Sequence, residues 1–323
     1  MRLKFIAEMS ANHNGSLERA LKIAEMAAGA GCFALKLQTY TPEEITMDPE
    51  LKKIYEVGQT PREWHKEIFN HCKVLGIRCF SSPFSVGAVD FLEQFEPWAY
   101  KISSFEVGDL ELVKAVAKTK RNVVMSIGMA SKLEIQLALD TLREYGASSI
   151  TLLKCTSAYP APVENMNLTT LLEMKRLYKT EVGISDHNLS HLPSLVAISL
   201  GATMVEKHFT LKRSDGGIDS MFSIEPGEMV DLIAQAGWVE KIAGKVHFGP
   251  TPGERVDLKR SLHVIEDLKK GDTLGFNNVK ALRPAGGLAP KTLYSILGAH
   301  VNKDVSAGSP LTIDMIEFGR AKS

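Results

Sequence analysis

Two histidines could hold a metal ion together. His187 and His208 each follow a short apolar run, and the two runs are consecutive along the chain. Side chains at the ends of adjacent parallel strands, which lie about 4.8 Å apart, can reach one metal ion. Two imidazoles would leave coordination positions open for water and a substrate oxygen, which suits a Lewis acid. Each histidine alone is equally consistent with a packing or capping role.

Two lysines and several serines end other apolar runs. Lys36 and Lys101 could bind phosphate or carboxylate as fixed cations, form a Schiff base with a carbonyl substrate, or extend to solvent at the rim of the fold. The serine hydroxyls expected beside them belong to Ser82, Ser104, Ser126 and Ser185. Any one of these serines could cap a strand, but hydroxyls and lysines facing one cavity predict a phosphorylated substrate.

Several carboxylates are candidate acids or bases. Glu8 and Glu206 lie within apolar runs, where a carboxylate is costly to bury without a partner. We expect Glu206 to pair with Lys207 or with another lysine, in a structural role. Glu106 follows a strand end, where a proton shuttle could act, and Asp219 is a further candidate.

The elements that must position these residues form a repeating pattern. Apolar runs buried on both faces and separated by helical stretches are typical of parallel strands. The runs occupy residues 5–8, 33–38, 77–82, 99–104, 123–126, 150–155, 182–187 and 204–208. Eight such runs predict an α/β fold, a (β/α)8 TIM barrel, whose active site lies at the carboxyl ends of the strands.

Helices are predicted between these runs. Ser16 can cap the first helix, whose apolar residues repeat at three- and four-residue spacing before Gly29 and Gly31. The later helices are expected at residues 61–75, 85–95, 109–118, 131–145, 165–179, 191–200 and 226–243.

The pattern changes after residue 245. We expect a barrel domain at residues 1–245, a linker rich in Gly and Pro at 246–260, and a small domain of short strands and turns at 261–323. About sixty residues are marginal for an independent core, so the small domain is expected to dock on another surface.

Composition excludes several classes of function. Lys+Arg and Asp+Glu both number 38, so the formal net charge is zero, and no basic stripe indicates a nucleic-acid partner. No apolar stretch reaches the length of a membrane span, and the N-terminus meets Glu8 before a signal-like core forms. The four scattered cysteines are typical of reduced thiols, so we expect a cytoplasmic protein.

The ordered motifs resemble the sialic acid synthase family, which makes nonulosonic acids from phosphoenolpyruvate and an amino-sugar aldehyde. The resemblance covers essentially the whole chain. Its motifs are AEMSANHNG at residues 7–15, KLQTYT at 36–41, CFSSPF at 79–84, YKISSFE at 100–106, LKCTSAYP at 153–160, GISDH at 183–187 and EKHFT at 206–210. The tail, from residues 260–262 through 282–284, resembles the family's antifreeze-like (SAF) domain.

Within that family the chain is most similar to the pseudaminic acid synthase branch. SANH at residues 10–13, EWHK at 63–66 and DGG at 215–217 point to it, as does Ser157, where sialic acid members typically carry asparagine. One feature departs from the branch: its members usually have a longer loop with Gly and Trp between the second strand and the next helix. Here residues 45–60 are expected to form a short loop near the sugar site.

The resemblance implies a metal-dependent condensation. His187 and His208 would hold a divalent cation, commonly manganese in the family, with magnesium or cobalt as alternatives. The catalytic residues implied are Glu106, Glu8 and Lys36. Those implied to bind phosphoenolpyruvate are Lys101, Ser82, Ser104, Ser126 and Ser185, and those implied for the sugar are Gln38, Ser157, Tyr159, Asp219 and Arg283.

The resemblance also implies a domain-swapped homodimer. In the family, the antifreeze-like domain of one subunit covers the barrel mouth of its partner. An arginine matching Arg283 then reaches the sugar, although Arg283 could instead form a salt bridge within its own domain.

Alternatives remain for substrate and for class. The acceptor expected is an altrose-type 2,4-diacetamido-2,4,6-trideoxy hexose, which would give pseudaminic acid. N-acetylmannosamine or its 2,4-diacetamido-trideoxy analogue would instead make the enzyme an N-acetylneuraminate or legionaminate synthase. A Schiff-base aldolase using Lys36 or Lys101 and a non-catalytic sugar-binding protein are the alternatives of other classes.

Overall fold

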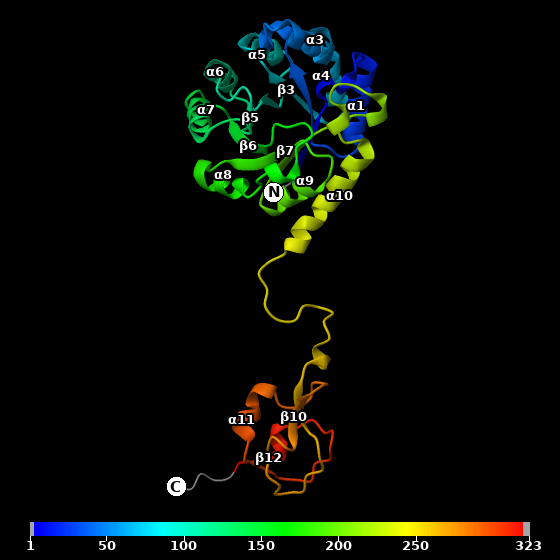
Figure 1. Ribbon diagram of the computed structural model, residues 1–323, viewed down its shortest axis with the longest axis vertical. Coiled ribbons are helices and arrows are strands. Elements are labelled where there is room, and N and C mark those ends of the chain that lie inside the picture. Colours follow the sequence, from blue (N-terminus) through cyan, green and yellow to red (C-terminus); the bar gives the residue numbers. More distant parts are fainter. Residues whose placement is uncertain (1–2, 319–323) are drawn as a thin grey trace. The chain divides into compact units, whose positions relative to one another are not determined.

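The chain folds into two compact units. In this computed structural model, which describes residues 3–318, the division along the chain falls between Gly244 and Lys245. Residues 1–2 and 319–323, at the outer ends of the two expected domains, lie outside the described residues. Each unit is considered by itself (Figure 1).

The first unit is the predicted (β/α)8 barrel. Eight parallel strands close on one another in sequence order, and helices surround them (Figure 1). The strands are β1 (Lys4–Glu8), β2 (Ala34–Thr39), β3 (Arg78–Pro83), β4 (Ala99–Ile102), β5 (Asn122–Ser126), β6 (Ser149–Cys155), β7 (Glu181–Asp186) and β8 (Met204–His208). The expectation of eight parallel strands is confirmed.

Strand register brings the polar strand ends together. Glu8 pairs in register with Lys36 on β2 and with His208 on β8. Ser185 on β7 pairs with Glu206 on β8. The candidate residues therefore lie at the carboxyl end of the barrel, where active sites of this fold occur.

Below these polar residues, the barrel interior is apolar. The inward-facing layer consists of Ile6, Ala34, Phe80, Ala99, Val124, Leu153 and Met204, each at most 1% exposed. On β7 this layer contains Gly183, where an added Cβ would lie 2.7 Å from Leu153 Cδ2. The glycine is needed for space, because its neighbours already fill the layer.

Eight of the helices follow the predicted pattern. They are α1 (Leu17–Gly29), α4 (His65–Leu75), α5 (Val86–Glu93), α6 (Leu110–Lys118), α7 (Lys132–Glu144), α8 (Thr170–Tyr178), α9 (Leu192–Ser199) and α10 (Pro226–Ala243). Ser16 caps α1 as expected, since its hydroxyl accepts a hydrogen bond from the Arg19 N–H at 3.2 Å.

The segment expected as a short loop at residues 45–60 contains a helix. After α2 (Pro42–Ile45), α3 spans Pro49–Gly58. Asp48 starts α3 by accepting hydrogen bonds from the N–H groups of Glu50 and Leu51, and Pro49 occupies the first turn. The sequence carried this capping signal, an acid followed by proline, but its short length favoured a loop.

The second unit is small and rich in turns. Its elements are β9 (Ser261–Val264), β10 (Val279–Leu282), α11 (Leu293–Ile296), β11 (His300–Val301) and β12 (Ile316–Glu317). A separate apolar cluster that includes Leu262, Val264 and Leu311 stabilises it.

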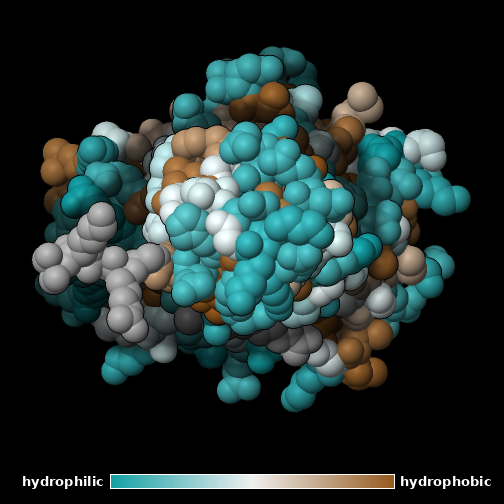
Figure 2. Space-filling model, turned by 90° about the horizontal axis from the view of Figure 1, so that it is seen from below, coloured by the Kyte–Doolittle hydropathy of each residue, from teal (hydrophilic) through white to brown (hydrophobic). Residues whose placement is uncertain are grey.

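Two features of the described residues bear on membrane insertion: the polarity of one face and the hydropathy of the helices. The face seen in Figure 2 is mainly hydrophilic, with hydrophobic residues in small, separated groups. Between residues 3 and 318, no helix combines the length and hydropathy needed to cross a bilayer. All four cysteines are buried and unpaired.

Candidate active site

A cavity of about 170 Å³ lies at the carboxyl end of the barrel. It brings together eleven residues singled out from the sequence: Glu8, Lys36, Gln38, Ser82, Lys101, Ser104, Ser126, Tyr159, Ser185, His187 and His208. Six further lining residues were not assigned to the site from the sequence: Tyr55, Phe84, Ser103, Phe105, Cys155 and Glu206, the last of which was expected to have a structural role. Residues from all eight strands or the loops that follow them therefore converge on one space.

Two lysines and two glutamates form a buried ion cluster in this cavity. Lys36 Nζ lies 2.9 Å from Glu8 Oε2 and 3.6 Å from Glu206 Oε1. Lys101 Nζ lies 3.2 Å from the same Glu206 oxygen. The four side chains are at most 5% exposed. Because an isolated buried charge is very costly, each of these groups depends on the others.

The two acids of the cluster respond differently to their surroundings. Burial raises the pKa of Glu8, and repulsion from Glu206 adds to this effect although Lys36 opposes it. Burial would also raise the pKa of Glu206, but Lys101 and Lys36 outweigh burial and lower it. Glu8 is therefore the acid that takes up a proton first, for example when an anion enters. Two ammonium groups would then face one carboxylate, which leaves a net positive charge.

The two histidines are neutral and close together. Their ring centroids are 5.4 Å apart, and burial lowers the pKa of each to about 3. His187 Nδ1 donates a hydrogen bond to the Thr156 carbonyl at 2.9 Å, which leaves the Nε2 lone pair available. His208 Nδ1 is buried, and its nearest acid oxygen, Asp219 Oδ2, is 3.8 Å away. Neutral imidazoles with available nitrogens fit a metal ion.

The histidine pair would be a sparse metal site. Across residues 3–318, no group of three or more His, Cys, Asp or Glu side chains is arranged to hold a metal. The protein would therefore supply two nitrogen ligands, and water or substrate oxygens would complete the coordination, as the sequence predicts.

Several polar atoms of the cavity are buried without a hydrogen-bond partner within the described chain. They are Ser126 Oγ, Glu206 Oε2 and His208 Nδ1. Buried polar atoms in native proteins nearly always have a partner. Their convergence in one cavity leaves them free to bind ordered water or a polar ligand.

Glu106 is connected to this cavity through one neighbouring residue. It is absent from the lining residues, but its carboxylate accepts a hydrogen bond from the hydroxyl of Ser103, which lines the cavity. Burial raises the pKa of Glu106 to about 7. A carboxyl group that titrates near neutral pH, connected to a cavity by a hydroxyl, can exchange protons with a bound substrate.

Three other sequence candidates also lie outside the lining of the central cavity. Ser157 does not line the cavity, but its Oγ lies 2.7 Å from Oγ of Ser104, which does. Asp219 follows β8, where its carboxylate accepts a hydrogen bond from the Ala11 N–H at 3.2 Å. Arg283 follows β10 in the second unit and is exposed.

Glu206 is the main cavity residue that the sequence reasoning assigned elsewhere. It pairs with Lys36 and Lys101, the second of the two expected possibilities, whereas Lys207 pairs with Asp186 at 3.0 Å. Alternation along β8 could have shown this, because residues 206 and 208 share one face of the strand and residue 207 has the other.

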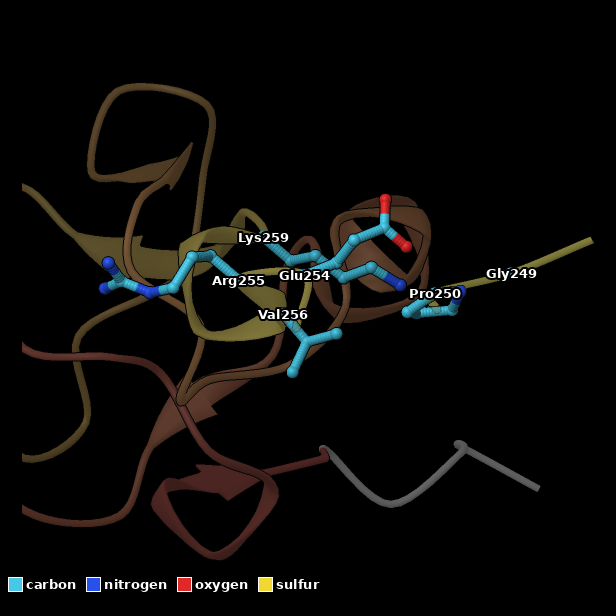
Figure 3. Close-up of a pocket in the computed structure, with 6 residues that line it drawn as sticks. All are labelled: Gly249, Pro250, Glu254, Arg255, Val256 and Lys259. Atoms are coloured by element: carbon cyan, nitrogen blue, oxygen red, sulfur yellow. The ribbon is translucent and has the colours of Figure 1, made fainter. Parts of the chain in front are cut away.

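A hollow along the segment that precedes β9 has a different character. Figure 3 shows its six lining residues, with the side chains of Glu254 and Arg255 pointing away from each other. Arg255 pairs instead with Asp257, through a hydrogen bond of 2.8 Å from Nε. These exposed residues do not converge on a common centre, and we assign them no site.

The barrel and its cavity fit a class of enzyme in which buried cations would bind an anionic substrate beside a histidine pair able to hold a metal ion. Comparison with family models narrows this class. Residues 23–248 match the NeuB family, and residues 259–317 match the SAF domain. The chain belongs to the NeuB family, and the resemblance seen in the sequence is confirmed.

Individual relatives extend over nearly the whole chain. Pseudaminic acid synthase of Campylobacter jejuni (strain 81-176) is 40% identical over 95% of this chain and 94% of that protein. Pseudaminic acid synthase of Helicobacter pylori is 38% identical over 97% and 98%. The crystal structure of an N-acetylneuraminic acid synthetase from Leptospira borgpetersenii is 29% identical. It aligns with a TM-score of 0.74 over 78% of this chain and 88% of that one.

The ion cluster predicts a large stability effect for one substitution. Glu206→Gln removes the charge shared by Lys36 and Lys101, so we expect the free energy of unfolding to fall by about 3 kcal/mol. Urea unfolding followed by tryptophan fluorescence measures this in the barrel, because all three tryptophans lie in the first unit.

The control is Glu173→Gln, which breaks the exposed pair between Glu173 and Arg176. It is expected to leave the unfolding midpoint unchanged, because exposed pairs contribute little. Equal midpoints for the two variants would contradict a structural dependence on the buried cluster.

Proposed function

We propose that this protein condenses phosphoenolpyruvate with an altrose-type 2,4-diacetamido-2,4,6-trideoxy hexose, giving pseudaminic acid and phosphate. The observation that carries the proposal is the buried lysine pair beside two neutral histidines, with partnerless polar atoms around them. The 38–40% identity to pseudaminic acid synthases supports this acceptor over N-acetylmannosamine, since the N-acetylneuraminic acid synthetase is 29% identical.

Phosphoenolpyruvate would bind in the central cavity. Lys36 and Lys101 supply the positive charge, and the hydroxyls of Ser82, Ser104, Ser126 and Ser185 supply hydrogen bonds. Lys36 already lies 3.2 Å from Ser82 Oγ, so cation and hydroxyl can share one anionic oxygen. Protonation of Glu8 on anion entry would relieve the repulsion between this acid and the substrate.

His187 and His208 would hold the divalent ion, for which we propose manganese. When bound, such an ion polarises the aldehyde of the acceptor and makes its carbon electrophilic. The remaining acceptor contacts are proposed for Gln38, Tyr159 and Asp219. Tyr159 lies over His187 with ring centroids 4.2 Å apart, and Gln38 Nε2 donates to Glu8 Oε1 at 2.9 Å.

The residues of the chain then guide the reaction of the two substrates. Carbon 3 of phosphoenolpyruvate forms a bond to the aldehyde carbon, whose oxygen takes a proton, and positive character develops at carbon 2. Water adds at carbon 2, and its proton passes through the Ser103 hydroxyl to Glu106. That proton balances the one taken up by the aldehyde oxygen. In the resulting tetrahedral intermediate the bond between carbon 2 and the phosphate oxygen breaks, the carbon 2 hydroxyl gives its proton to the departing phosphate, and a keto group forms.

A Schiff-base aldolase that uses Lys36 is disfavoured by the charge state of this lysine. A lysine that attacks a carbonyl needs a lowered pKa so that its amine is neutral. Burial acts in that direction on Lys36, but Glu206 and Glu8 outweigh it and raise the pKa of this lysine. A fixed cation matches that state better than a nucleophile does.

The direct test measures phosphate release from phosphoenolpyruvate with Mn²⁺ and a panel of acceptors. We expect release with the altrose-type acceptor and little with its mannose-configured analogue or N-acetylmannosamine. A chelator should abolish release, and Mn²⁺ should restore it. His187→Ala and His208→Ala should each lower the rate by about 100-fold or more, and calorimetry should show weakened Mn²⁺ binding.

His71→Ala is the matched control for this test, because His71 lies on α4, contacts Glu25 and does not line the cavity. Its rate and Mn²⁺ affinity should equal those of the wild type. Release with another acceptor alone would replace the proposed sugar, and release that survives complete chelation would contradict the metal assignment.

The pKa of Glu106 predicts the pH dependence of the reaction. Below about pH 7 the raised pKa keeps this carboxyl protonated and unable to accept a proton, so the rate should rise as pH increases through about 7. Glu106→Gln should lower kcat by about 100-fold and remove this rise. In contrast, Glu111→Gln, an exposed change on α6, should retain the full profile.

Arg283 is proposed to complete the site of a partner subunit in a domain-swapped homodimer. Arg283→Ala should lose most activity while the barrel unfolds at the wild-type midpoint. Mixing it with His187→Ala should restore about a quarter of wild-type activity, because half of the dimers are hybrids and each hybrid has one intact site. Absence of recovery after verified subunit exchange would contradict a shared site.

A further inference from the structure

A second hollow of about 410 Å³ adjoins the central cavity. The two spaces share five lining residues: Gln38, Tyr55, Phe105, Tyr159 and His208. A molecule held at the histidine pair can therefore extend from one space into the other. We call this second hollow the annex.

The wall of the annex away from the histidines is largely apolar. It includes Ile54 and Tyr55 from α3 and Ile218 from the segment after β8, whereas Phe222 lines the annex beside His208. Ile54 is 52% exposed and Ile218 43% exposed, so both present apolar surface that a ligand could cover. Two polar residues of the lining connect the annex to the central cavity. Gln38 shares β2 with Lys36, and Asp219 Oδ2 lies 3.8 Å from His208 Nδ1.

One end of α3 is shaped to keep the annex open. Gly58 lines it, and an added Cβ would lie 2.9 Å from Tyr40 Oη and 3.8 Å from Ile218 Cδ1. Tyr40 is only 4% exposed and packs edge-on against Tyr55 at 5.7 Å and Phe84 at 5.3 Å, so its ring has little room to move. The glycine is thus required for space rather than for backbone conformation.

We propose that the annex selects acceptor sugars whose non-reacting end carries methyl groups, and that Ile54 and Ile218 are the residues that determine this specificity. The inference rests on the proposed function, because it takes the aldehyde carbon to lie at the histidine pair. The far end of the open-chain sugar then extends toward the apolar wall. The methyl group comes either from a deoxygenated carbon 6 or from an acetamido group on carbon 4.

The energetic reason is the burial of a methyl group in place of a hydroxyl. A methyl group against Ile54 and Ile218 gains apolar contact, whereas a hydroxyl there loses its hydrogen bonds to water without replacement. One such group in a hydrophobic pocket changes binding by about tenfold or more. The helix α3 lies where members of the pseudaminic acid synthase branch usually have a longer loop. The inference therefore gives this segment a direct role in substrate choice.

The test measures binding separately from turnover. The probes are three alditols, which lack the aldehyde and do not react: the 2,4-diacetamido-2,4,6-trideoxy compound, its 6-hydroxy analogue and its 4-hydroxy analogue. Calorimetry on the full-length protein with Mn²⁺ should show about tenfold or more weaker binding of at least one hydroxy analogue. Ile54→Asn and Ile218→Asn should each remove most of that difference, and the two arms identify which methyl group is recognised.

Val57→Asn is the matched control, because Val57 lies on the same helix, is 62% exposed and does not line the annex. It should keep the wild-type discrimination. Equal discrimination in Ile54→Asn, Ile218→Asn and Val57→Asn, or wild-type binding that ignores the methyl groups, would overturn the inference.

Phosphate release with the corresponding aldehydes, measured in parallel, separates the two proposals. Release without discrimination between the alditols leaves the proposed reaction standing and refutes the role of the annex. Discrimination without release supports the annex and refutes the reaction.

Discussion

The buried ion cluster is the constraint on which the site depends. Lys36 and Lys101 are almost inaccessible to solvent, and a lysine in that position stays charged only when acids lie against it. Glu8 and Glu206 meet this need: strand register sets Glu8 beside Lys36, and the ammonium groups of Lys36 and Lys101 both reach Glu206. The cluster therefore fixes both the charge that meets a substrate and the side chains that surround it.

The barrel interior is arranged in layers by the two-residue periodicity of its strands. Ile6 and Met204 belong to the apolar layer, and Glu8 and Glu206, two residues further along the same strands, belong to the ionic layer. Two residues beyond Glu206, His208 ends β8 on the same face of the strand. Along β8 the apolar floor, the ion cluster and a proposed metal ligand thus follow in order toward the carboxyl end of the strand.

The sequence predicted the barrel and most of the cavity because parallel strands place their carboxyl ends together. It left the partner of Glu206 open between Lys207 and another lysine of the barrel, since the choice depends on which face of β8 points inward. It also did not predict the helix at α3, where capping by Asp48 outweighs the short length of the segment. In the proposed domain swap, the place of Arg283 would depend on an arrangement of subunits, which no local sequence pattern encodes.

The apolar floor has a consequence for the order of events. With the layer around Leu153 and Phe80 closed to solvent, molecules enter and leave the barrel through its mouth alone. On the proposed assignment, phosphoenolpyruvate occupies the deeper position and the sugar the outer one. On that assignment a sugar that bound first would obstruct the anion, and binding would be ordered, with phosphoenolpyruvate first and the sugar second. The packing of the floor would in this way set the order in which the two substrates bind.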